Sequence, residues 1–261
     1  MKIVNKPLEK TADVSSARGT AWKEFRHLVL SALLLLIVLY FSLGFIVDRT
    51  VSRISFGTEA KIFKHYKLQD VEKKDAEKQG DLERASAILE KLKADEKIPP
   101  LPYHLVLIDY ETPNAFAFPG GSIGLSTALL EVLDDEIEVA FVIGHELGHF
   151  YNRDHLRGLG RAAGFGIIMT VLFGNSSGSG SFGNMINFVL QRTYSQDREE
   201  LADRFGLELV YSVYGKVEGT DRLFQIIHEN DKMPKWAYMF SSHPSPEQRI
   251  DDLEEYAQKL R

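Results

Sequence analysis

The sequence predicts an α+β protein that is mainly helical, with a small β-sheet and one N-terminal transmembrane helix. Three observations lead to this class. A long uncharged apolar stretch, Leu28–Val47, lies near the start of the chain. Short β-rich runs between residues 103 and 126 are separated by turn residues. Helical spacing of apolar residues dominates the remainder, and one such stretch contains the sequence HELGH at residues 145–149.

The amino-acid composition excludes several kinds of binding site. The chain has 261 residues, a net charge of −6 and no cysteine. The length suits one sizeable domain with an appendage. The acidic balance gives no indication of nucleic-acid binding. Because cysteine is absent, disulfides and thiolate ligands are excluded, and any zinc site must use His, Asp or Glu.

The stretch Leu28–Val47 is predicted to anchor the chain in a lipid bilayer. At about 1.5 Å per helical residue it crosses a hydrocarbon core of ~30 Å. A signal peptide has a shorter apolar region, and residues 48–51 (DRTV) make a poor cleavage site. A buried core helix would carry a polar stripe, which is missing here. The flanking basic residues nearly balance, so the short N-terminal tail favours an orientation with the rest of the chain outside the cytoplasm, and the reverse orientation stays open.

The middle of the chain alternates helix and strand signals. A charged stretch from Thr58 to Lys97 is typical of a surface helix packed on the main domain, with Ala85, Ile88, Leu89 and Leu92 at helical spacing. Prolines at 99, 100 and 102 end it. The expected strands are Tyr103–Asp109, Asn114–Phe118 and Ser122–Ser126, the last two joined by a Pro-Gly-Gly turn.

Helices are expected from Thr127 onward. Asp134 and Asp135 are suited to cap the helix that carries HELGH, which we expect to run on past Asn152 through Arg157. Residues 162–173 are apolar but too short to span a bilayer alone, so they predict a buried or interfacial helix. Residues 174–184 are rich in Gly and Ser, which suits a linker or a mobile flap near a cleft.

The sequence HELGH matches the HExxH pattern of zinc hydrolases. His145 and His149 are four residues apart, so they lie one turn apart on the same helix face and can reach one tetrahedral Zn²⁺. Glu146 lies beside the first histidine, where it can take a proton from a water that the metal activates. The pattern alone arises by chance, and a third ligand is needed to support a metal site.

The best third ligand is Glu199, in the sequence SQDREELAD at 195–203. Asp203 lies four residues further on, where it can accept the second ring N–H of a ligating histidine. A rival is His155, six residues after His149, which is the metzincin spacing. That motif needs a turn at Asn152, where Asn is poorer than Gly. A solvated acidic helix face is the alternative interpretation of residues 199–203.

Four blocks of sequence resemble the HtpX and CAAX-prenyl-protease family, which consists of membrane-associated zinc metalloendopeptidases of the gluzincin class. The blocks are NAFAFPGG at 114–121, HELGH at 145–149, EELAD at 199–203, and SSHP at 241–244 followed by Arg249 and Ile250. Their order and spacing match from about Tyr103 to Arg261. This chain departs from the family in having Gln196 where Arg is frequent, and in having one evident spanning segment.

The resemblance implies a role for each block. His145, His149 and Glu199 would bind one Zn²⁺ per chain, and Glu146 would be the general base. Asp203 and Arg249 would support the site from outside the ligand shell. The strand segment Asn114, Ala115, Phe116 and Ala117 would pair with an extended substrate backbone. His243 would stabilise the oxyanion of the tetrahedral intermediate or, in a resting state, approach the metal.

The sequence thus predicts a membrane-anchored zinc metalloendopeptidase with a gluzincin domain, acting on proteins or peptides in protein quality control. The alternative is a latent or non-catalytic zinc-stabilised chaperone or assembly factor. The expected location is a bacterial inner membrane, crossed once, with the catalytic domain in the periplasm. The expected segments are a polar tail at 1–26, the anchor at 27–48, a helical lead-in at 49–102 and the metallopeptidase domain at 103–261. Substrate identity and oligomeric state stay open.

Overall fold

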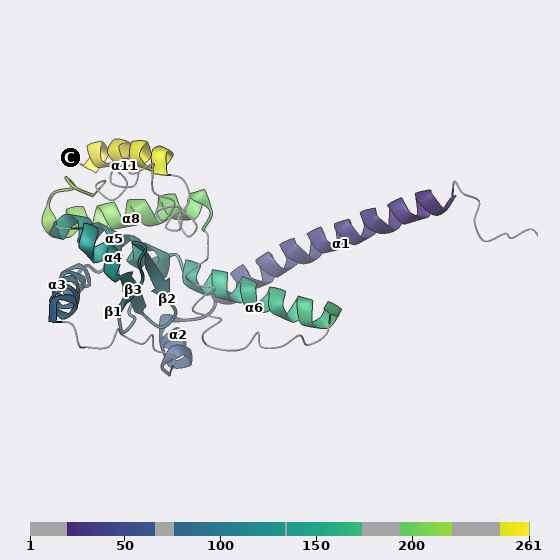
Figure 1. Cartoon of the computed structure of the whole chain (residues 1–261), viewed down its shortest axis with the longest axis horizontal. Coiled ribbons are helices and arrows are strands. Elements are labelled where there is room, and N and C mark those ends of the chain that lie inside the picture. Colours follow the sequence, from purple (N-terminus) through teal and green to yellow (C-terminus); the bar gives the residue numbers. More distant parts are fainter. Residues whose placement is uncertain (1–19, 66–75, 134, 174–193, 221–245, 261) are drawn as a thin grey trace, which may run out of the picture. The chain divides into compact units, whose positions relative to one another are not determined.

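The computed structural model describes residues 20–65, 76–133, 135–173, 194–220 and 246–260. The chain divides into two compact units, Met1–Ile46 and Val47–Arg261. The predicted class is confirmed, because the described part is mainly helical with one small sheet (Figure 1). The predicted segment boundaries at 48/49 and 102/103 stay predictions.

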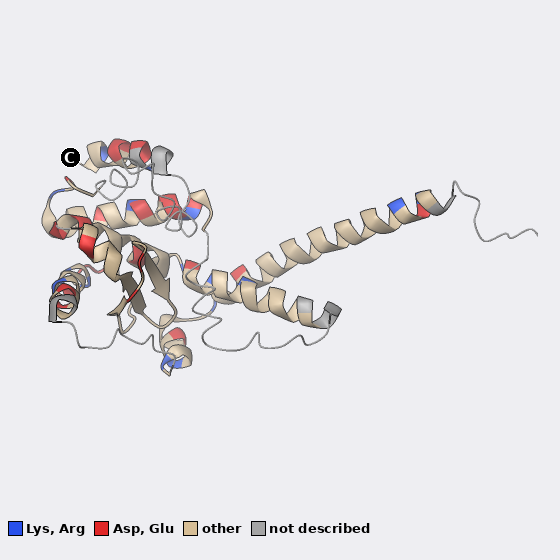
Figure 2. Ribbon diagram, in the orientation of Figure 1, with Lys and Arg blue, Asp and Glu red and all other residues tan. Residues whose placement is uncertain are grey.

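Helix α1 spans Thr20–Val51 and contains the whole predicted anchor. Of the helices described, it alone is long and apolar enough to cross a membrane, over Trp22–Val51. Figure 2 shows charged residues only near its two ends. The most apolar part of the helix is not buried against protein, which argues against the core-helix alternative.

The sheet has three strands in the order β1-β3-β2. Strand β3 (Ser122–Ser126) lies in the centre, parallel to β1 (His104–Ile108) and antiparallel to β2 (Ala115–Phe118). Because of this order, β2 is an edge strand within the described part of the chain. The turn between β2 and β3 needs positive φ at Gly120 (92°) and Gly121 (98°), which glycine adopts without steric cost.

The segment before the sheet forms two helices, α2 (Phe56–Phe63) and α3 (Ala76–Leu92). The helical spacing predicted in α3 is confirmed, because its four periodic apolar residues are buried with the sheet and α5 in one hydrophobic core. These residues are Ala85, Ile88, Leu89 and Leu92. Helix α3 is thus part of the same core as the main domain.

Helix α5 (Glu136–Tyr151) carries HELGH and is the most buried of the described helices. Asp135 begins it with a capping box: its side chain accepts from the backbone N–H of Ile137 at 2.7 Å, and Glu138 reaches back to the backbone of Asp135. Short α4 (Thr127–Val132) precedes it. The predicted N-cap is therefore present at the second of the two aspartates.

Helix α8 (Gln196–Tyr214) packs along α5 at close range. A Cβ added to Gly206 would lie 2.9 Å from the backbone nitrogen of His145, and one added to Gly148 would lie 3.0 Å from Cα of Ala202. Side chains at these glycines would force the two backbones apart. The small residues therefore fix how near α8 can bring its acidic side chains to the histidines. Helix α11 (Pro246–Leu260) packs on α8 from the other side.

The prediction that the HELGH helix continues through Arg157 is wrong. Helix α5 ends at Tyr151, Arg153 has φ of 61°, and α6 (Asp154–Phe173) begins immediately after it. A left-handed conformation is costly for arginine, so surrounding contacts must impose it. The Arg153 guanidinium donates to the carbonyl of Ile54 at 2.6 Å, pairs with Glu59 at 3.2 Å and lies 4.1 Å from the ring centroid of Phe56.

Glu59 is a buried carboxylate that joins three parts of the fold. It is fully buried, and besides Arg153 it pairs with Nε2 of His155 at 2.7 Å and accepts from the backbone N–H of Gly120 at 3.0 Å. Burial alone would raise the pKa of Glu59, but these hydrogen bonds and charges lower it below its usual value. Helix α2 is thereby tied to the end of α5 and to the turn after β2.

Candidate metal centre

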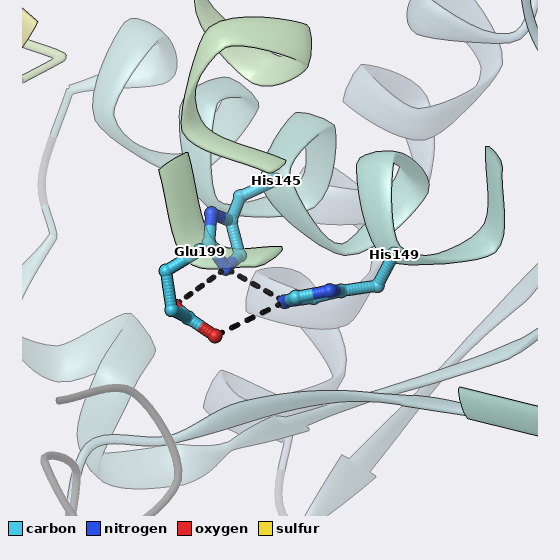
Figure 3. Close-up of side chains that lie close together, drawn as sticks. All are labelled: His145, His149 and Glu199. Carbon is cyan, nitrogen blue, oxygen red and sulfur yellow. Dashed lines mark hydrogen bonds and ion pairs between the residues drawn. The ribbon is translucent and has the colours of Figure 1, made fainter. Parts of the chain in front are cut away.

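Three side chains from α5 and α8 converge at one point (Figure 3). The Nε2 atoms of His145 and His149 are 3.1 Å apart, and each lies 3.6 Å from a carboxylate oxygen of Glu199. All three side chains are buried. The HELGH spacing and the close contact of α8 with α5 together produce this cluster.

Each histidine is oriented by a second carboxylate. Nδ1 of His145 lies 2.8 Å from Oδ1 of Asp203, and Nδ1 of His149 lies 3.2 Å from Oδ2 of Asp154. A neutral imidazole that donates from Nδ1 has its lone pair on Nε2. Both lone pairs then face the Glu199 carboxylate, which is the arrangement that a cation requires.

The spacing of these donors fits a divalent metal. An ion bound tetrahedrally at ~2.0–2.1 Å from two nitrogens holds those nitrogens about 3.3 Å apart. The observed 3.1 Å between the Nε2 atoms is close to this value. Two imidazoles and one carboxylate also form a donor set that leaves a position for water or substrate. The residues present therefore fit a catalytic metal ion.

Arg249 on α11 supports the cluster from the outside. It donates to both oxygens of Asp203, at 2.7 and 2.6 Å, and lies 3.2 Å from Glu199. Burial alone would raise the pKa of Asp203, but the charge of Arg249 and the hydrogen bonds from His145 and Arg249 hold it at about 2. Asp203 is therefore an anion at neutral pH, and it holds the His145 ring in place.

Glu146 lies next to His145 on α5 and is 1% exposed. Its negative charge is close enough to Arg249 to contribute to a raised pKa of that guanidinium, which burial alone would lower. The side chain thus lies in the same enclosed, charged region as the proposed ligands. The predicted oxyanion group, His243, lies outside the described residues.

The structure brings Glu199, and not His155, to the two imidazoles. The His155 ring pairs with Glu59 through Nε2 and lies 3.3 Å from the carbonyl of His149 through Nδ1. Both of its nitrogens therefore make contacts away from the cluster. The chain does turn after HELGH, as the metzincin spacing requires, but the positive φ is at Arg153 and the histidine points elsewhere.

Sequence reasoning missed two residues at this site. Asp154 orients His149 and is itself paired with Arg157 at 3.6 Å and Arg198 at 3.5 Å. Tyr194 stacks on the His149 ring, with centroids 3.9 Å apart and planes at 13°. Asp154 could have been found from the sequence, because it is an acidic residue only five positions after His149. Histidines that bind a metal commonly donate their second ring N–H to a carboxylate. Nothing in the local pattern around Tyr194 pointed to stacking.

The proposed substrate strand lies against the metal helix. Strand β2 packs on α5, and its backbone pairs only with β3 among the described strands. The backbone N–H of Asn114 donates to Oγ of Ser126 at 2.8 Å, which fixes where β2 begins. Ala115, Phe116 and Ala117 are buried. Strand addition by a peptide would use the outer edge of β2.

Fold and site together have the arrangement typical of metal-dependent hydrolases in which an HExxH helix is completed by a glutamate from a second helix. The chain belongs to peptidase family M48, whose family model matches residues 77–257. The family relationship predicted from the four sequence blocks is thereby confirmed.

Curated relatives match the chain over about two thirds of its length. The chain is 26% identical over 175 residues to the beta-barrel assembly-enhancing protease of Escherichia coli K12, and 25% identical over 174 residues to that of Yersinia pestis. Each match covers 61% of this chain and 35% of the relative. The mitochondrial metalloendopeptidase OMA1 of Schizosaccharomyces pombe is 27% identical over 173 residues, covering 66% and 51%. The matched region is thus a third to a half of each relative's length.

Proposed function

We propose that this chain is a zinc-dependent endopeptidase held at a membrane by α1. The observation that carries this proposal is the convergence of His145, His149 and Glu199 in a buried cluster with oriented imidazoles. Membership of peptidase family M48 supports the reaction class. Two histidines and one glutamate, with the histidines on an HExxH helix, form the donor set of catalytic zinc sites in metalloproteases.

The three ligands would hold the ion, and the other side chains would carry out the proton transfers. When bound, zinc would act as a Lewis acid and would lower the pKa of the attacking water to ~7. Glu146 takes the proton of the attacking water and returns it to the leaving amine. Asp203 and Asp154 keep the imidazoles in the ligating tautomer, and Arg249 keeps Asp203 anionic.

The substrate would bind as an extended strand beside β2. Its backbone would pair along the outer edge of β2, which brings a scissile carbonyl alongside α5. His243, by resemblance to the family, would donate to the developing oxyanion. Such pairing uses backbone hydrogen bonds and depends little on the side chains of the substrate. Unfolded segments, whose backbone is accessible, are therefore suitable substrates. This supports a role in protein quality control, as does the likeness to a protease named for assembling β-barrels.

Metal-dependent hydrolysis of an unfolded protein tests this function. The full chain in detergent is expected to cleave reduced, unfolded casein, to stop when 1,10-phenanthroline removes the metal, and to recover when zinc is restored. Cleavage is followed by the release of new amino termini. Binding of casein without cleavage at full zinc occupancy would instead favour the chaperone or assembly-factor alternative.

We also propose that the domain after α1 lies outside the cytoplasm, in the periplasm of a bacterial inner membrane. The apolar stretch Leu28–Val47 supports the anchor, and the short tail before it supports the orientation. Alkaline phosphatase fused after Arg261 is therefore expected to be active, because that reporter folds only after export. An inactive phosphatase together with a fluorescent cytoplasmic reporter at the same position would reverse the orientation.

A further inference from the structure

Helix α6 presents an apolar surface that no described residue covers. Its charged residues all precede Ala162, and residues 162–173 carry no charge. Within that stretch the side chain of Phe165 is 59% exposed and that of Ile167 is 66% exposed. Two large apolar side chains so close together are unusual on a surface that faces water.

The start of α6 is fastened to the end of the proposed anchor. A Cβ added to Gly160 would lie 2.9 Å from Cγ1 of Val47, so these residues are already in close contact. Asp48 pairs with Arg157 at 3.3 Å and with Arg161 at 3.2 Å. Val47 and Asp48 mark the point where the uncharged stretch of α1 ends, and hence where α1 would leave the hydrocarbon.

With α1 as a membrane anchor, these contacts would put Gly160 at the level of the bilayer surface. The two arginines next to it suit the headgroup region, where basic side chains interact with lipid phosphates. From Gly160 to Phe173 the helix advances about 20 Å at 1.5 Å per residue. That length is less than the ~30 Å of a hydrocarbon core, so the segment cannot cross the bilayer.

We propose that residues 162–173 of α6 insert into the same leaflet at which α1 leaves the membrane, with Phe165 and Ile167 in contact with lipid acyl chains. The proposal rests on α1 being a membrane anchor. Lipid is the expected contact of this apolar surface, because the surface begins next to Val47 and Asp48, where the uncharged stretch of α1 ends. Charge patterning agrees, since the basic residues lie at the surface end and the uncharged residues beyond it.

Insertion would hold the metal centre beside the bilayer. Asp154, which orients His149, lies on the first turn of the same helix, about 9 Å along the axis from Gly160 at 1.5 Å per residue. A peptide segment emerging from the membrane would therefore meet the site without long-range diffusion.

The absence of cysteine makes a direct test possible. Single cysteines are introduced as Phe165→Cys and Ile167→Cys, with Leu35→Cys in α1 as the lipid control and exposed Ala87→Cys in α3 as the water control. Each full-length variant carries an environment-sensitive fluorophore in vesicles of phosphatidylcholine and phosphatidylglycerol. Quenching by nitroxide-labelled lipid is compared with quenching by aqueous iodide.

The labels at 165 and 167 are expected to match Leu35: quenched by nitroxide lipid and several-fold less sensitive to iodide than Ala87. Iodide quenching equal to that of Ala87 would overturn the proposal. Protection from both quenchers would also overturn it, because protein would then cover the surface. If iodide quenches the label at Leu35 as strongly as the label at Ala87, α1 is not a membrane anchor and the proposal is overturned. Hydrolysis of casein in detergent does not depend on the anchor, so it still tests the proposed reaction separately.

Discussion

Glu146→Gln is expected to remove nearly all peptide hydrolysis while leaving fold and metal content unchanged. The amide has the size of the carboxylate but cannot accept the proton of the attacking water. Loss of a general base typically lowers the rate by about 10²–10⁴-fold. Glu146 is buried beside His145 but does not belong to the group that could hold the metal, so zinc should stay bound.

The measurement pairs casein hydrolysis with metal analysis and a thermal melt of the same preparation. Glu131→Gln is the matched control, because it makes the same chemical change at an exposed position on α4. It should behave as the unmodified chain does. Hydrolysis by Glu146→Gln at a near-normal rate would show that another group accepts the proton.

Glu199→Ala is expected to abolish stoichiometric zinc binding. It removes one of three ligands, and two histidines alone do not form a closed or stable site. Asp154→Asn should have a smaller effect, about 10–100-fold in metal affinity, because it weakens only the orientation of His149. Metal content per chain after dialysis against a zinc buffer separates these two magnitudes.

His155→Ala provides the opposing control. In the structure this ring pairs with Glu59, so its removal should lower stability while leaving about one zinc per chain in the folded fraction. Zinc retained by Glu199→Ala and lost from His155→Ala would establish the metzincin arrangement instead. Circular dichroism of each variant shows whether the chain is folded. Loss of zinc through unfolding is then not mistaken for loss of a ligand.

The parts of the site that local spacing governs were predictable from sequence. HELGH places two imidazoles on one helix face because the period of a helix is fixed. The spacing of Glu199 and Asp203 likewise places both on one face of α8, and the structure brings that face to His145. The small side chains at Gly148 and Ala202 permit close packing of the two helices. These inferences need no knowledge of the rest of the fold.

The helix break after HELGH depends on contacts that are distant in sequence. Arg153 adopts its positive φ because Ile54, Phe56 and Glu59, almost a hundred positions earlier, surround its guanidinium. The local sequence is compatible with an uninterrupted helix, so periodicity alone predicts one. Asp154 was missed for the same reason, since its approach to His149 depends on that break.

The Glu59 cluster also determines how the chain can be shortened. The family match begins at residue 77, yet the carboxylate that pairs with buried Arg153 and His155 lies upstream of it. A fragment cut at that boundary would lose the Ile54 carbonyl, the Phe56 ring and the Glu59 carboxylate, which hold Arg153 in its left-handed conformation. We therefore expect a stable fragment to begin before Ile54. Residues 54–59 lie outside the region that the family model matches, but they belong to the same compact unit as the metal-binding cluster.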